Sequence, residues 1–86
     1  MDKPKITYGQ LEDLMLSFGF ELTVLPKGHR QFRHPASIAQ ATLPAYSRDA
    51  LAHAAHWMGI RGTLDDFGFL PREQFFDALR ERSPAA

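Results

Sequence analysis

Apolar residues recur at helical spacing between residues 8 and 18, and polar residues fill the other side of the run. Thr7 and Gln10 stand three residues apart at its start, which is the spacing of a capping box. Gly19 follows the last apolar position and indicates the helix end. The pattern predicts an amphipathic helix over residues 8–18. Its apolar stripe consists of Tyr8, Leu11, Leu14, Met15 and Phe18, and its solvent side of Glu12, Asp13 and Ser17.

The apolar period then changes to two, which is typical of strands. Residues 20–25 and 30–34 each alternate, and Pro26 and Gly28 lie between them. This arrangement predicts a β-hairpin. Residues 38–43 predict a third short strand that ends at a proline.

Alternation divides the second strand into two faces. If Phe32 points into the core, Arg30 and His34 lie on its side of the sheet. The opposite face then carries His29, Gln31 and Arg33.

Two further helices are predicted. Ser47 is a candidate N-cap for a helix over residues 50–58, and Gly59 is its expected end. Residues 61–70 are rich in glycine and predict a loop, and a C-terminal helix covers residues 71–82. The inner face of the first of these helices is expected to hold Leu51, Ala54, Ala55 and Met58, and the other side His53, His56 and Trp57.

The C-terminal helix carries an apolar stripe of Phe75, Phe76 and Leu79 that needs a partner. Trp57 is the nearest candidate within the chain, and His53 and His56 are expected to pack beside it. A second copy of the chain, contacting this helix in a homo-oligomer, or another protein is the alternative.

The predicted order of elements favours an α+β fold with a three-stranded antiparallel sheet and helices packed on one face. We expect a single domain over residues 1–86. Its core falls in about residues 6–60, with the loop at residues 61–70 and the last helix at 71–82.

Composition narrows the function classes. The 86 residues contain no cysteine, which excludes disulfides, thiolate metal sites and thiol catalysis. The net charge is zero, yet residues 26–62 hold five basic residues against Asp49 alone. No apolar run approaches the length of a membrane span and the N-terminus lacks a secretory signal, so we expect a cytoplasmic protein with no membrane partner.

The run Gly28-His29-Arg30-Gln31-Phe32-Arg33-His34-Pro35 resembles the HicA (YcfA-like) family of toxins. The likeness extends to Phe18-Gly19-Phe20, Thr42-Leu43-Pro44, Met58-Gly59-Ile60 and Pro71-Arg72-Glu73-Gln74-Phe75. The sequence departs from the family where Lys27-Gly28 replaces glycine and a hydroxyl residue, and where residues 61–70 form an apparent insertion.

The resemblance implies a double-stranded-RNA-binding-domain-like fold, cleavage of mRNA and neutralisation by a cognate antitoxin protein. His29 is the candidate catalytic residue, because a histidine can transfer protons near neutral pH. The predicted RNA-binding residues are Lys27, Arg30, Gln31 and Arg33. Neither a metal nor another cofactor is expected.

Other interpretations stay open. His34 precedes a proline and is expected to have a structural role. His53 and His56 are three residues apart, but no cysteine or matching carboxylate favours a metal site there. The alternative function is a catalytically inactive RNA-binding or protein-interaction module of the same fold.

Overall fold

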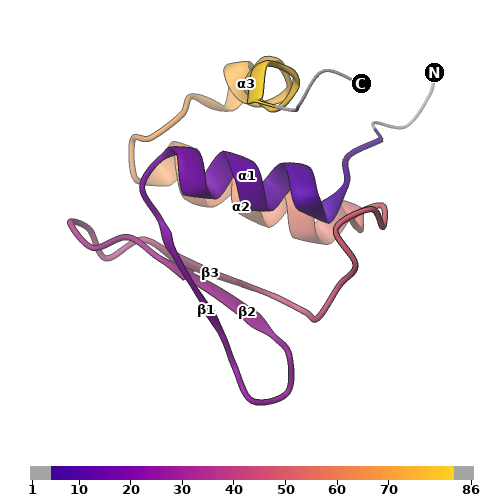
Figure 1. Ribbon diagram of the computed structural model, residues 1–86. Coiled ribbons are helices and arrows are strands. Elements are labelled where there is room, and N and C mark those ends of the chain that lie inside the picture. The colour runs from indigo at the N-terminus through magenta and orange to yellow at the C-terminus, as the bar shows by residue number, and fades with distance from the viewer. Residues whose placement is uncertain (1–4, 83–86) are drawn as a thin grey trace.

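Strands and helices follow one another in the predicted order in the computed structural model, which describes residues 5–82. The elements are α1 (Tyr8–Ser17), β1 (Glu21–Val24), β2 (Arg30–Arg33), β3 (Gln40–Leu43), α2 (Ala54–Asp66), the 3-10 turn η1 (Arg72–Gln74) and α3 (Phe75–Arg82) (Figure 1). The capping box of α1 is confirmed: the Thr7 hydroxyl accepts from the Gln10 amide, and the Gln10 side chain accepts from the Thr7 amide. The α+β class and the antiparallel sheet are confirmed as well.

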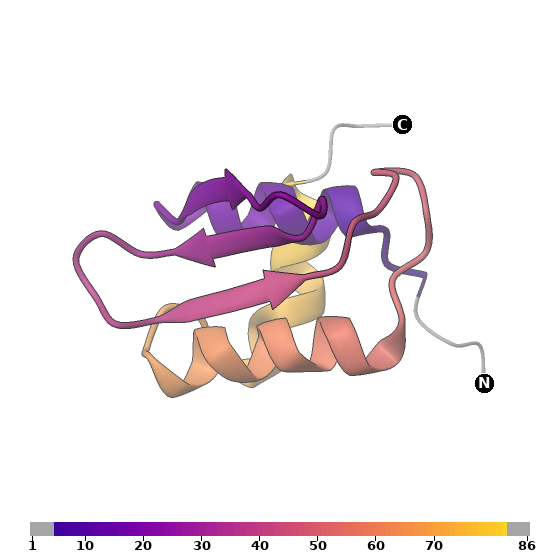
Figure 2. The ribbon, with the colours of Figure 1, turned by 90° about the horizontal axis from the view of Figure 1, so that it is seen from below.

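β2 is the central strand, with β1 and β3 on either side of it, both antiparallel. Phe32 pairs with Leu22 on β1 and with Ala41 on β3, so these side chains share one face of the sheet. The helices cover this face alone. Figure 1 shows them above the sheet, and Figure 2, seen from below, shows no helix in front of the strands.

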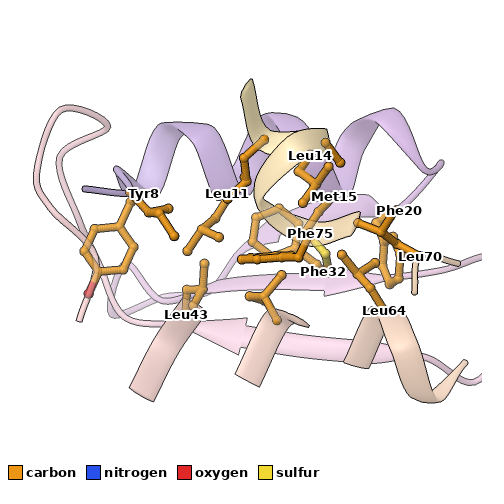
Figure 3. Packing of buried hydrophobic residues seen from close by; sticks show 14 of the residues in the cluster. Tyr8, Leu11, Leu14, Met15, Phe20, Phe32, Leu43, Leu64, Leu70 and Phe75 are labelled. Atoms are coloured by element: carbon orange, nitrogen blue, oxygen red, sulfur yellow. The ribbon is translucent and has the colours of Figure 1, made fainter. Parts of the chain in front are cut away.

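The core lies between the sheet and the helices, and Phe32 and Phe75 are fully buried at its centre (Figure 3). Leu64 and Leu79 are also buried, so the core extends beyond residues 6–60 into α2 and α3. Truncating a fully buried phenylalanine costs about 3–5 kcal/mol, which makes Phe32 and Phe75 major contributors to stability.

The predicted start of the second helix at residue 50 is wrong, because the chain there pairs with the beginning of α1. The amide of Tyr8 donates to the carbonyl of Ala50, and the amide of Ala52 donates to the carbonyl of Ile6. These bonds hold the segment extended against the N-terminus of α1, where backbone amides lack partners within the helix. The helix therefore begins at Ala54, after an N-cap at His53 that makes no side-chain cap bond.

The predicted helix end at Gly59 and the predicted loop from residue 61 are also wrong. Ile60 and Leu64 are buried four residues apart on α2. Their burial outweighs a glycine cost of about 1 kcal/mol in a helix interior. The helix ends at Asp66, about two turns beyond Gly59 and shortly before Gly68, whose φ of 78° lies in the left-handed region.

This longer helix presents a different face to the core than the one predicted. Met58 on α2 is exposed, as is Leu51 in the extended segment before the helix, whereas Trp57 packs against the core. The ring of Trp57 lies 6.1 Å from that of Phe75 and 5.4 Å from that of Phe76. Trp57 is therefore the partner of the last helix, as predicted. The homo-oligomer remains a prediction.

The helices within residues 5–82 are too short or too polar to cross a bilayer.

Candidate functional site

His29 stands directly after the turn of the β1–β2 hairpin. The amide of Gly28 donates to the carbonyl of Leu25 over 2.8 Å, and the amide of Leu25 donates to the carbonyl of His29 over 2.7 Å. Gly28 has a φ of 88°, and a Cβ there would lie 3.1 Å from the Cβ of Ala45. Three-residue hairpin loops commonly place glycine at this left-handed position. The turn therefore requires glycine immediately before His29.

The His29 side chain is exposed to solvent and makes no hydrogen bond, ion pair or ring contact within residues 5–82. Lys27, in the turn two residues earlier, is exposed as well. Both side chains are free to bind a ligand that approaches the hairpin.

Gln31 and Arg33 continue the line of His29 along β2. Strand alternation places all three side chains on the face away from the helices, because the intervening Phe32 is fully buried. At about 3.3 Å per residue, Gln31 lies about 7 Å from His29 and Arg33 about 13 Å from it, measured along the strand. His29 and Arg33 therefore contact different parts of any extended ligand.

Polar residues of the neighbouring strands widen this surface. Gln31 pairs with Thr23 on β1 and Thr42 on β3, and Arg33 pairs with Glu21 and Gln40 in the same way. We call the surface made by the side chains of Glu21, Thr23, Gln31, Arg33, Gln40 and Thr42 the outer face. It carries no aromatic ring, so it offers hydrogen bonds and charge rather than base stacking.

Arg30 does not join the outer face. Its Nη1 lies 2.7 Å from a Glu12 carboxylate oxygen, and its guanidinium lies 4.5 Å from the centre of the Tyr46 ring. The predicted placement of Arg30 on the face of Phe32 agrees with these contacts. Among the predicted RNA-binding residues, Arg30 is the one that the structure separates from His29.

Glu12 is the centre of a polar cluster beneath the hairpin that the sequence patterns did not predict. Its carboxylate accepts from Arg30, from the Tyr46 hydroxyl over 2.8 Å and from Arg48 over 2.6 Å. Its side chain is only 10% exposed, so the predicted solvent side of α1 was wrong for this residue. The available signal was its spacing, because Glu12 lies four residues after Tyr8, at the edge of the apolar stripe.

Stacked tyrosines extend this cluster to α2. The Tyr46 ring lies parallel to the Tyr8 ring at 4.7 Å, and the Tyr8 hydroxyl is 2.6 Å from Nδ1 of His56. Burial, the hydrogen bond to Glu12 and the Glu12 charge raise the pKa of Tyr46 above its ordinary value, against the lowering effect of Arg30. The predicted packing of His56 beside Trp57 is wrong, since His56 binds Tyr8 instead.

His34 has the structural role that the sequence predicts. The amide of Ala36 donates to Nδ1 of His34 over 3.1 Å, so the ring proton lies on Nε2, which donates to the carbonyl of Phe18 over 3.1 Å. The ring packs edge-on to Phe20 and against Phe69. Both ring nitrogens are used, and His34 has none left for a substrate.

Residues 5–82 contain no group of three or more histidine or carboxylate side chains arranged to hold a metal ion. A scan against protein-family models, a search of curated proteins and a search of solved structures each found no match.

Proposed function

We propose that this chain is a HicA-like toxin that cleaves mRNA without a metal ion, with His29 as the proton-transfer group. The observation that carries the proposal is the position of His29. Its exposed ring makes no hydrogen bond, ion pair or ring contact within residues 5–82, and it stands at the end of the strand that carries Gln31 and Arg33 on the outer face. Catalytic groups that act on a large substrate need this kind of access.

The fold supports the resemblance at the finer level of a double-stranded-RNA-binding-domain-like arrangement. Both α1 and α2 lie on one face of an antiparallel three-stranded sheet, in the order helix, three strands, helix. Since α2 runs to Asp66, residues 61–66 belong to the second helix and need not be an insertion. One departure from the family pattern is thereby reduced.

The proposed chemistry is attack by a ribose 2′-hydroxyl on the neighbouring phosphorus. The 2′-oxygen forms the new bond, the bond from phosphorus to the 5′-oxygen breaks, and the products are a 2′,3′-cyclic phosphate and a 5′-hydroxyl. His29 removes the proton of the 2′-hydroxyl or protonates the leaving oxygen, a contribution of about 10²–10⁴-fold. Lys27, which is exposed in the turn two residues before His29, is the candidate for stabilising charge on the reacting phosphate.

A second candidate is an RNA-binding module of the same fold without turnover. Among the described residues, His29 is the only histidine beside the outer face with unbonded ring nitrogens, because both ring nitrogens of His34 are bonded. Cleavage requires both a base and an acid. The other proton transfer would fall to Lys27 or to water. The third candidate is a protein-interaction module that binds no RNA. In the toxin hypothesis and in the protein-interaction hypothesis alike, a partner protein covers the outer face.

Cleavage of single-stranded RNA by purified protein in excess EDTA tests these candidates. The toxin proposal predicts cleavage by the wild type and by His53→Ala, a control that removes another exposed histidine, and a loss of about 10²-fold or more in His29→Ala. Equal rates for His29→Ala and the wild type would exclude the proposed role. Salt-sensitive RNA binding without cleavage products would support the RNA-binding module. Absence of RNA binding would support the protein-interaction module.

Growth of a host that expresses the chain gives an independent test. The proposal predicts that wild-type expression arrests growth, that His29→Ala does not, and that coexpression of a cognate antitoxin restores growth. Harmless expression of wild-type protein at high levels would contradict the toxin function.

A further inference from the structure

A hollow of about 350 Å³ lies at the end of β2 that is remote from His29. It is formed where the start of β1, the end of β2 and the β2–β3 loop meet. Its volume is at the lower end of the range of about 300–1,000 Å³ for small-ligand sites. The lining residues are Glu21, Thr23, Arg33, His34, Pro35 and Ser37.

The hollow holds one acidic and one basic side chain that form no ion pair with each other. Glu21 and Arg33 are cross-strand neighbours and both are exposed, yet neither forms an ion pair within residues 5–82. Most other arginines of the described residues bind a carboxylate, among them Arg30 and Arg48. The guanidinium and the carboxylate at this hollow therefore remain available to a ligand.

Hydroxyl groups complete the set of hydrogen-bonding groups. Ser37 accepts from the amide of Ala39 through its Oγ, which leaves its hydroxyl hydrogen free to donate. Thr23 is exposed beside it on β1. His34 forms a wall of the hollow but contributes no free nitrogen, because both of its ring nitrogens are bonded.

The distance from His29 identifies which part of an RNA strand reaches this hollow. Arg33 follows His29 by four residues, or about 13 Å along β2. A stacked strand rises about 3.4 Å per nucleotide, so 13 Å corresponds to about four nucleotides, and to fewer in a more extended strand. A strand that is cleaved beside His29 therefore reaches the hollow two to four nucleotides away, if it follows β2.

We propose that this hollow is a subsite that binds one nucleotide a few positions away from the cleaved bond and discriminates between bases there. This inference rests on the proposed ribonuclease function. Arg33 binds the phosphate of that nucleotide, since a guanidinium donates two parallel hydrogen bonds to phosphate oxygens. Glu21 accepts from the exocyclic amine of the base, as carboxylates do from cytosine N4. Uracil has no exocyclic amine and is disfavoured at this position.

The subsite predicts that cleavage depends on substrate length and on one remote base. We would measure cleavage in EDTA for fluorescein-labelled oligoribonucleotides that grow one nucleotide at a time from a dinucleotide, with cytosine or uracil at each added position. The wild type should gain about tenfold once the strand reaches the hollow, and about fivefold or more for cytosine over uracil there. Arg33→Ala should lose the gain with length, and Glu21→Gln should lose the preference for cytosine.

Matched controls separate the subsite from general charge effects. Arg72→Ala and Glu73→Gln change exposed charges on η1, outside the sheet, and should leave both dependences intact. Cleavage by the wild type with dependences unchanged in Arg33→Ala and Glu21→Gln would overturn the subsite alone. Failure of the wild type to cleave any oligonucleotide would overturn the proposed function, and the subsite with it.

Discussion

Glu12→Ala should destabilise the protein strongly, because one carboxylate binds three donors beneath the hairpin. Its side chain is 10% exposed, and Arg30, the donor on β2, is 26% exposed. Removing Glu12 leaves the Arg30 guanidinium and the Tyr46 hydroxyl partly buried without their acceptor. Arg48 is 48% exposed and can be rehydrated.

The magnitude follows from these exposures. Removing one partner of a buried ion pair costs about 3–5 kcal/mol, and the partial exposure of Arg30 lowers the expectation to about 2–4 kcal/mol. Glu12→Gln keeps an acceptor oxygen but loses the charge, so it should cost about 1–2 kcal/mol. Asp13→Ala is the matched control. Its side chain is 31% exposed and binds only Arg48. Asp13→Ala should therefore lower the free energy of unfolding by about 0–1 kcal/mol.

Urea denaturation followed by the fluorescence of Trp57 measures these differences. With a slope of about 1 kcal/mol per molar urea, Glu12→Ala should lower the midpoint by about 2 M or more. The interpretation of Glu12 as the anchor between α1 and β2 would be refuted by a Glu12→Ala midpoint equal to that of Asp13→Ala.

Three further predictions concern Tyr46 beside Glu12, Gly28 in the hairpin turn and Gly59 inside α2. The pKa of Tyr46 is raised, so its contribution to stability is present below pH 10 and lost as pH rises further; Tyr46→Phe should show a smaller alkaline loss of stability in denaturation at several pH values, and an equal loss would contradict the burial of the hydroxyl. Gly28→Ala should cost about 1–2 kcal/mol in urea denaturation because φ is 88° there, and a neutral effect would contradict the turn geometry. Gly59→Ala should stabilise by about 0.5–1 kcal/mol because nothing lies within 4 Å of its Cβ position inside α2, whereas destabilisation would indicate that the helix does not continue through it.

Much of the fold followed from local patterns. The capping box at Thr7 fixed the start of α1, and the alternation around Phe32 fixed the two faces of β2. These features depend on neighbours within a few residues, which a sequence displays directly. The turn at Gly28 was predicted for the same reason.

The second helix could not be placed in this way, because long-range contacts decide its bounds. Pairing of residues 50–52 with residues 6–8 delays its start, and burial of Ile60 and Leu64 carries it past Gly59. Local propensity favours a break at a glycine, whereas packing against the rest of the core favours continuation. Only the folded arrangement shows which effect is larger.

The candidate site could likewise be predicted only in part. His29, Gln31 and Arg33 could be assigned to one face from alternation alone, while Arg30 needed the position of Glu12 to show its ion pair. The remote hollow was not predicted as a site, although Arg33, one of its lining residues, was among the predicted RNA-binding residues. Its signal was present in the hairpin register, because pairing of Leu25 with His29 across the turn sets Glu21 opposite Arg33.

The proposed function places RNA on the outer face of the sheet, next to His29. A nuclear magnetic resonance titration of ¹⁵N-labelled protein with a 2′-O-methyl oligonucleotide, which cannot be cleaved by 2′-hydroxyl attack, tests it most directly. We expect the amide signals of His29, Gln31 and Arg33 to shift, together with those of Thr23 and Thr42, while the signals of α3 do not. Shifts confined to the helices, or no shifts at all, would contradict it.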